Sequence, residues 1–256
     1  MILFNQVIFG PIRSRRLGLS LGVNLLPVDA KICSFNCIYC ECGFNTTMQE
    51  FPFPTRAQVK EILATKLQQM TADGEIPDVI TFAGNGEPTL HPDFEGIIDD
   101  TLELRNQFCA SAKVSVLSNS TRIHKPHIFN ALKKVDNNIL KFDSAIDRTM
   151  KLIDQPVGKH INVSWLTQQL QHFDGKLIIQ TMFLRGEYQG EKIDNTTDEE
   201  VNAWIDALKI IKPKQVMIYS LDRDTPVQNL QKVYVEELNR IAEKVRAQGF
   251  EVSVAG

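Results

Sequence analysis

The sequence lacks a long apolar run, a large net charge and a linker-like segment. Its 28 lysines and arginines nearly balance 31 aspartates and glutamates, and the net charge of −3 supplies no overall basic field for nucleic acid. No apolar run approaches the roughly 18 residues that span a bilayer, and the apolar start Met1–Phe4 precedes the first arginines, the reverse of a secretory signal. With 43% hydrophobic residues and no stretch rich in proline, glycine and serine, residues 1–256 are expected to form one domain. These absences predict a cytoplasmic protein without a membrane segment.

Cysteine is also scarce, and its placement is uneven. Of five cysteines, Cys33, Cys37 and Cys40 form the pattern C-x-x-x-C-x-x-C. An odd number crowded in this way suits metal ligation in a reducing compartment better than a disulfide framework. Three such thiolates can hold three corners of a 4Fe-4S cluster and leave the fourth iron without a protein ligand. Two alternatives remain: Cys42 could complete a four-ligand zinc site or a closed ferredoxin-like cluster. Cys109 is expected to be an ordinary free thiol.

Short β-rich runs alternate with helical periodicity along most of the chain. Helices are expected from Thr55 as a candidate cap and from Thr197, with Glu200 as its capping-box partner, and a last helix ends before Gly249. Such alternation predicts an α/β fold with a parallel sheet, either an open doubly wound sheet or an incomplete barrel. The expected strands are Leu21–Leu26, Val79–Ala83, Lys113–Leu117, Ile139–Phe142, Leu177–Leu184, Val216–Ser220 and Glu251–Val254.

A second motif, Gly84-Asn85-Gly86-Glu87-Pro88, follows the expected strand Val79–Ala83. Together with the cysteine pattern it resembles the radical S-adenosylmethionine (radical SAM) superfamily, and the upstream segment Phe9–Gly18 resembles the branch that contains 4-demethylwyosine synthase. The resemblance implies a partial (β/α)6 TIM-like barrel. It also implies a 4Fe-4S cluster whose open iron binds S-adenosylmethionine (SAM), so that one electron cleaves SAM to a 5′-deoxyadenosyl radical that abstracts hydrogen. The family's usual central glycine is here Asn85.

The same resemblance assigns residues to SAM. Tyr39 would cover the cluster, and Gly84–Glu87 would receive the methionine amino group. Polar side chains that end later strands are expected to gather at one mouth of the barrel, because the carboxyl ends of parallel strands meet there. The candidates are Ser118, Asn119 and Asp143 for the ribose hydroxyls and Lys141 or Arg185 for the methionine carboxylate.

The motifs leave the substrate open. The branch resemblance favours wyosine-type modification of a tRNA base, although the chain lacks cysteines for a second cluster. Activation of a glycyl-radical enzyme, modification of a small molecule or peptide, and a noncatalytic iron-sulfur electron-transfer protein are the alternatives. The resemblance implies a flavodoxin- or ferredoxin-type reductant as partner. The candidate substrate contacts are Arg13, Arg15, Arg16, Tyr219 and Arg223, and Arg185–Asn195 is either a lid or an ordinary surface loop.

Overall fold

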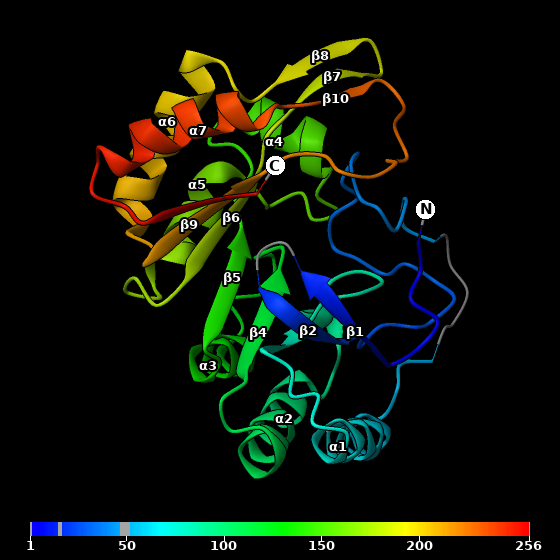
Figure 1. The fold of residues 1–256 in the computed structure, drawn as a ribbon. Helices are drawn as coiled ribbons and strands as arrows, with labels where there is room; N and C mark the ends of the chain where they lie inside the picture. The colour runs from blue at the N-terminus through cyan, green and yellow to red at the C-terminus, as the bar shows by residue number, and fades with distance from the viewer. Residues whose placement is uncertain (1, 15–16, 47–51, 256) are drawn as a thin grey trace.

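The computed structural model describes residues 2–14, 17–46 and 52–255 and is built around one curled, mostly parallel sheet (Figure 1). The first strand runs antiparallel to the second, and every later neighbouring pair is parallel. The sheet therefore forms a half-barrel, which confirms the predicted partial barrel and excludes a doubly wound sheet. In spatial order its strands are β1 (Ile8–Ser14), β2 (Gly18–Val23), β3 (Val79–Phe82), β4 (Lys113–Ser118), β5 (Asn137–Lys141), β6 (Ile178–Met182), β9 (Gln215–Tyr219) and β11 (Val252–Ala255).

Helices lie on the convex side of the sheet (Figure 1). Thr55 caps the first of them as predicted, with Gln58 completing a capping box. Thr197 also caps its helix, but the Glu200 carboxylate hydrogen-bonds to Ser144 at 2.7 Å instead of returning to the cap, so that capping box is only half formed. The helices are α1 (Arg56–Ala72), the short 3-10 helix η1 (Pro88–Leu90), α2 (Phe94–Phe108), α3 (Pro126–Lys134), α4 (Asp147–Asp154), α5 (Val163–Gln171), α6 (Asp198–Ile211) and α7 (Val235–Arg246).

The two faces of the sheet carry different residues. On β3, Ile80 and Phe82 belong to the main hydrophobic core beneath the helices, whereas Thr81 points to the concave face because side chains alternate along a strand. A separate small apolar cluster of Ile139, Ile178 and Met217 fills part of the concave face. Polar residues and loops above this cluster are therefore the natural place for a site.

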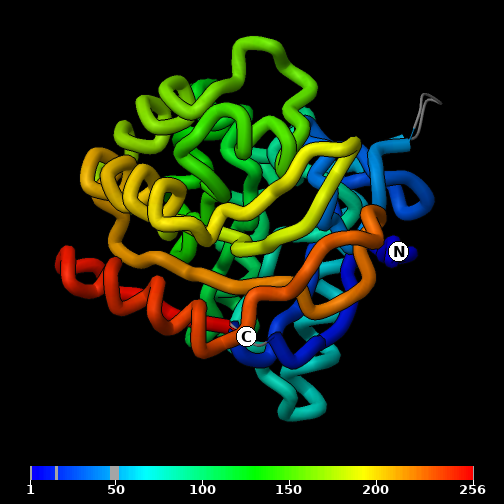
Figure 2. Tube along the Cα trace, turned by 90° about the horizontal axis from the view of Figure 1, so that it is seen from above, coloured from blue at the N-terminus to red at the C-terminus, as the bar shows by residue number. Residues whose placement is uncertain are grey.

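A second, three-stranded sheet lies above the end of the half-barrel to which β4 and β5 point (Figures 1 and 2). Its order is β10 (Leu230–Lys232), β7 (Leu184–Tyr188) and β8 (Glu191–Asp194). The sequence analysis missed this sheet and predicted Leu177–Leu184 as one strand, which is wrong at its end. The buried Asn195 accounts for the break: its amide donates to the carbonyl of Met182 at 2.7 Å, and its oxygen accepts from the N–H of Leu184 at 2.9 Å. The stretch Arg185–Asn195 thus contains most of the β7–β8 hairpin and ends at Asn195, the residue that follows β8.

Within the described ranges, no helix combines the length and the apolar character that a membrane span requires. Residues 1, 15–16, 47–51 and 256 lie outside the description.

Candidate functional site

The three cysteines of the motif lie on one loop between β2 and α1. Backbone hydrogen bonds hold this loop against the end of α4, from Asn36 to the carbonyl of Asp154 at 2.9 Å and from Ile38 to that of Ile153 at 3.0 Å. All five cysteines of the chain are free thiols. The charges of Cys33 and Cys40 both act on Cys37, so the three sulfurs share one small region.

The arrangement of these sulfurs bears on the kind of metal group. Among the described residues, no three histidine, cysteine, aspartate or glutamate side chains converge on a point that a single metal ion could occupy. In a 4Fe-4S cluster each cysteine sulfur binds a different iron, so the sulfurs stand farther apart than the ligands of one zinc ion. Three thiols on one loop could supply three such ligands.

Hydrogen-bond donors and a buried cation surround the thiols. The amide of Asn119 lies 3.4 Å from the sulfur of Cys33. A hydrogen bond from Cys42 and the charge of the buried Lys31 lower the pKa of Cys40 to about 6. Burial, with the charge of Glu87, raises the pKa of Cys33 to about 12. Binding of a metal group at Cys33 therefore displaces a proton, whereas the surroundings of Cys40 favour its thiolate form.

The glycine-rich segment is bonded directly to the cysteine loop. Ile32 and Gly86 form a parallel β-bridge, and Ile32 donates to the carbonyl of Asn85 at 2.9 Å and accepts from Glu87 at 3.1 Å. Gly86 has φ +140°, and a Cβ there would lie 1.8 Å from the carbonyl oxygen of Ile32. Only glycine permits this approach. The glycine at position 86 thus sets the position of Cys33, the next residue after Ile32.

The side chain of Asn85 is fully engaged by backbone groups. Its oxygen accepts from the N–H of Phe4 at 2.8 Å, and its amide donates to the carbonyls of Phe4 at 2.9 Å and Pro27 at 2.8 Å. The side chain is completely buried. At the position where the family usually has glycine, this chain therefore carries an anchor for its N-terminal segment. The side chain of Asn85 is occupied, so the predicted SAM contact at this position could be made only by its backbone.

Glu87 joins the glycine-rich segment to the end of β4. Its carboxylate accepts from Ser118 Oγ at 2.9 Å, from the N–H of Asn119 at 2.6 Å, and from the hydroxyl of Thr89 at 2.6 Å. Burial raises the pKa of Glu87, although these donors oppose the rise. The structure thus brings Glu87, Ser118 and Asn119 together beside Cys33, but the carboxylate of Glu87 is already bonded to the hydroxyl of Ser118 and to the backbone N–H of Asn119.

A buried polar cluster lies on the other side of the cysteine loop. Lys141 pairs with Asp143 and, at 2.9 Å, with Asp154, and the hydroxyl of Tyr39 hydrogen-bonds to both Lys141 and Asp143. The sulfur of Cys37 lies 3.7 Å from a carboxylate oxygen of Asp154. Burial lowers the pKa of Lys141, but the two aspartates more than offset it, so the pKa lies well above its usual value. The structure thus brings Tyr39, Lys141 and Asp143 together.

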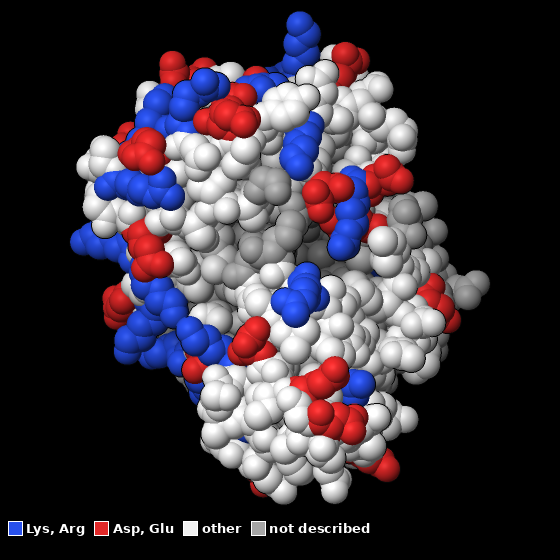
Figure 3. Space-filling view, in the orientation of Figure 1, with Lys and Arg blue, Asp and Glu red and all other residues white. Residues whose placement is uncertain are grey.

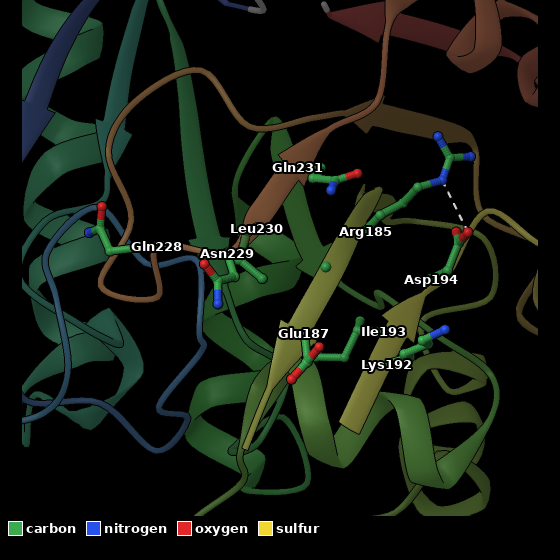
Figure 4. A pocket seen from close by; sticks show the side chains of 10 residues that line it. Arg185, Glu187, Lys192, Ile193, Asp194, Gln228, Asn229, Leu230 and Gln231 are labelled. Atoms are coloured by element: carbon green, nitrogen blue, oxygen red, sulfur yellow. Dashed lines mark hydrogen bonds and ion pairs between the residues drawn. The ribbon is translucent and has the colours of Figure 1, made fainter. Parts of the chain in front are cut away.

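Arg185 is placed elsewhere. It lies on β7 beside a cavity of about 570 Å³ in the small sheet, where its side chain turns toward Asp194 (Figure 4). Its guanidinium pairs with Asp194 at 3.0 Å and with Glu237 of α7, and Glu237 and Asp194 raise its pKa. Because both carboxylates already neutralise this arginine, its geometry supports an anchor for the small sheet instead of the predicted carboxylate contact with SAM.

The predicted substrate contacts are partly brought together. Arg13 of β1 and Arg223, which follows β9, line the same cavity of about 310 Å³. Tyr219 ends β9 and acts electrostatically on Lys141, so it lies on the side of the buried polar cluster. The predictions for Arg15 and Arg16 fall outside the described residues.

Sequence reasoning missed two residues at the cysteine loop, Lys31 and Asp154. Lys31 is 2% exposed and donates to the carbonyl of Gly43 at 2.6 Å, and its only sequence signal is its position two residues before Cys33. Asp154 is separated from Cys37 by 117 positions, and no pattern in the sequence connects them.

Comparisons with known proteins agree with this geometry. A model of the Radical SAM superfamily matches residues 28–161. A UPF0026 protein of Helicobacter pylori is 32% identical over 222 residues, which cover 85% of this chain and 67% of that protein. The corresponding protein of a second H. pylori strain is covered over 57% of its length, so this chain spans only part of its relatives.

Solved structures share the fold at low sequence identity. SuiB of Streptococcus suis, bound to S-adenosylmethionine, gives a TM-score of 0.64 at 15% identity, over 89% of this chain and 49% of SuiB. TYW1 with a lysine-pyruvate adduct gives a TM-score of 0.63 at 14% identity, over 89% of this chain and 73% of TYW1. The match of the family model over residues 28–161, on the loop that carries the three cysteines, shows that the chain belongs to the radical SAM superfamily.

Proposed function

We propose that this protein is an enzyme that cleaves SAM reductively at a 4Fe-4S cluster held by Cys33, Cys37 and Cys40, and that the resulting radical takes a hydrogen atom from a substrate. One observation carries the proposal: in a member of this superfamily, three thiols on one loop are bonded through Ile32 to the segment Gly84–Glu87. When bound, the cluster supplies a single low-potential electron and an iron that can coordinate SAM.

The chain's own residues stabilise the thiolate ligands. Asn119 donates toward Cys33, and the ammonium groups of Lys31 and Lys141 lie near Cys40 and Cys37. Each favours the charged form of a ligand sulfur. Backbone hydrogen bonds to α4 and to the glycine-rich segment hold the loop in place.

For SAM itself, we propose contacts at Gly84–Glu87 and at the cluster of Tyr39, Lys141 and Asp143. These groups border the cysteine loop from two sides, which supports a cosubstrate that lies across it. Of the two cations expected for the methionine carboxylate, we retain Lys141, because its charge acts on Cys37 of the cysteine loop, whereas Arg185 lies on β7 of the small sheet.

The electron must come from outside the chain. We propose a flavodoxin- or ferredoxin-type protein as donor, and a reducing, cytoplasmic setting in which the free thiols of this chain persist. The choice of donor is tested by the rate of cluster reduction with each protein.

The central test is product formation under strictly anaerobic conditions. The chain is loaded with iron and sulfide and mixed with SAM and dithionite, and nucleosides are separated by chromatography. We expect 5′-deoxyadenosine from the wild-type protein and none from Cys37→Ala. A fully loaded wild-type protein that releases no 5′-deoxyadenosine would refute the proposal.

A second test separates this enzyme from a noncatalytic electron carrier. The sulfur of Cys42 lies 3.4 Å from the carbonyl oxygen of Gly84 and within hydrogen-bond reach of Cys40. As the remaining cysteine of the loop as described, it is the candidate for a fourth ligand. Cys42→Ala should keep four irons per chain and an electron paramagnetic resonance signal that changes when SAM is added. Loss of the cluster in Cys42→Ala would instead support the electron carrier.

A further inference from the structure

The cavity that Arg13 and Arg223 share lies on the concave face of the sheet. Its floor includes Ser20 of β2 and Thr81 of β3, whose hydroxyls hydrogen-bond at 2.8 Å, and the neighbouring positions on both strands point into the main core. Glu41, which follows Cys40, and Ala83, which precedes Gly84, also line it. The cavity therefore adjoins both motifs of the proposed SAM site.

One wall of the cavity is flat and apolar. The rings of Phe4 and Phe9 stack with their centroids 3.8 Å apart. A Cβ at Gly22 would lie 2.2 Å from the ring of Phe9, so glycine at this position lets that ring lie directly on β2. Asn85 holds Phe4 through both of its backbone groups. The wall is thereby fixed to the glycine-rich segment beside the SAM site.

The charged groups that line the cavity differ in how they are paired. Glu41 pairs with Arg223 at 2.6 Å, and Asp222 lies 3.7 Å from the ammonium of Lys232, which is outside the cavity. Arg13 is exposed at the rim and has no ion pair within the described part of the chain. Among the described lining groups, Arg13 is therefore the cation that is open to a ligand.

We propose that this cavity is the substrate site and that it accepts a small molecule with a carboxylate or phosphate group. This inference rests on the proposed function. The anionic group meets Arg13, whose planar guanidinium suits two-point contact with either anion, and the rest of the molecule lies on the wall of Phe4 and Phe9. A volume of about 310 Å³ fits a metabolite and lies at the lower end of the usual range of about 300–1,000 Å³.

The surface carries charges of both signs. On the face in Figure 3, the described acidic and basic side chains are interspersed.

The test measures the binding of simple probes to the cluster-loaded chain, without reductant. Benzoate and phenyl phosphate carry the two anions on a flat ring, and benzamide is the neutral counterpart of benzoate. By ligand-observed NMR titration, we expect saturable binding of at least one anion and at least fivefold weaker binding of benzamide. Arg13→Gln should weaken the anion at least fivefold and leave benzamide unchanged, and Arg240→Gln, at an exposed arginine of α7, should change neither. The preferred anion distinguishes a carboxylate substrate from a phosphate.

Three results would overturn the inference: equal binding of benzoate and benzamide, unchanged anion binding in Arg13→Gln, or complete displacement of the anion by SAM, which would assign the cavity to the cosubstrate. The measurement needs no electron and no SAM cleavage. Failure of the probe-binding test therefore leaves the proposed SAM cleavage unaffected. Absence of 5′-deoxyadenosine together with normal probe binding would instead refute SAM cleavage and leave the cavity as a binding site for anions.

Discussion

Replacing Asn85 by alanine tests whether this residue is an anchor for the N-terminal segment. The change removes three hydrogen bonds, two to Phe4 and one to Pro27, of 2.8 to 2.9 Å. Each contributes about 1 kcal/mol net, so we expect the free energy of unfolding to fall by about 3 kcal/mol. For a chain of this size that corresponds to a melting temperature lower by about 6–12 °C. Asn85→Gly should show at least the same loss, because glycine also lacks the amide.

The assay is urea unfolding of the cluster-free chain in excess reductant, followed by circular dichroism. Asn106→Ala is the matched control: Asn106 is exposed on α2, and its loss should change the free energy of unfolding by less than about 0.5 kcal/mol. Because Phe4 forms one wall of the cavity, Asn85→Ala should also weaken benzoate binding, whereas Arg13→Gln should leave stability unchanged. Wild-type stability in Asn85→Ala would refute the reasoning.

Two further changes test the cysteine loop and the helical layer. Gly86→Ala places a Cβ against the backbone of Ile32, so we expect the free energy of unfolding to fall by about 1–3 kcal/mol. We also expect less than half of the wild-type iron content, measured by iron analysis. Full iron loading of this variant would contradict the close approach of the two backbones. Asp100 accepts from Arg56 at 2.7 and 2.9 Å, and these bonds hold its pKa below the usual 3.8. Its stabilisation is therefore present above pH 3.8 and lost as the pH falls below that value, so Asp100→Asn should flatten the acid limb of the stability profile measured by urea unfolding. An unchanged acid limb would show that the pair contributes nothing measurable.

The order of strands and helices was readable from local patterns because each depends on near neighbours in the chain. Thr55 caps α1 where a cap was expected, and the run Val79–Ala83 became β3 with one residue fewer. The small sheet was not readable in this way. Leu184 looks like a continuation of the strand before it, and only the side chain of Asn195, folded back from 11 positions away, ends β6 and starts β7.

Local patterns were enough to identify the three thiols, the glycine-rich segment and the alternation of strand and helix, because spacing, backbone freedom and hydrophobic period are properties of short stretches. What lies beside these features depends on the tertiary structure. Asp154 reaches Cys37, Arg223 joins Arg13 at one cavity, and Arg185 is taken up by Glu237. Those pairings depend on how the half-barrel curls and where its loops return, and no local pattern encodes contacts between residues more than about fifty positions apart.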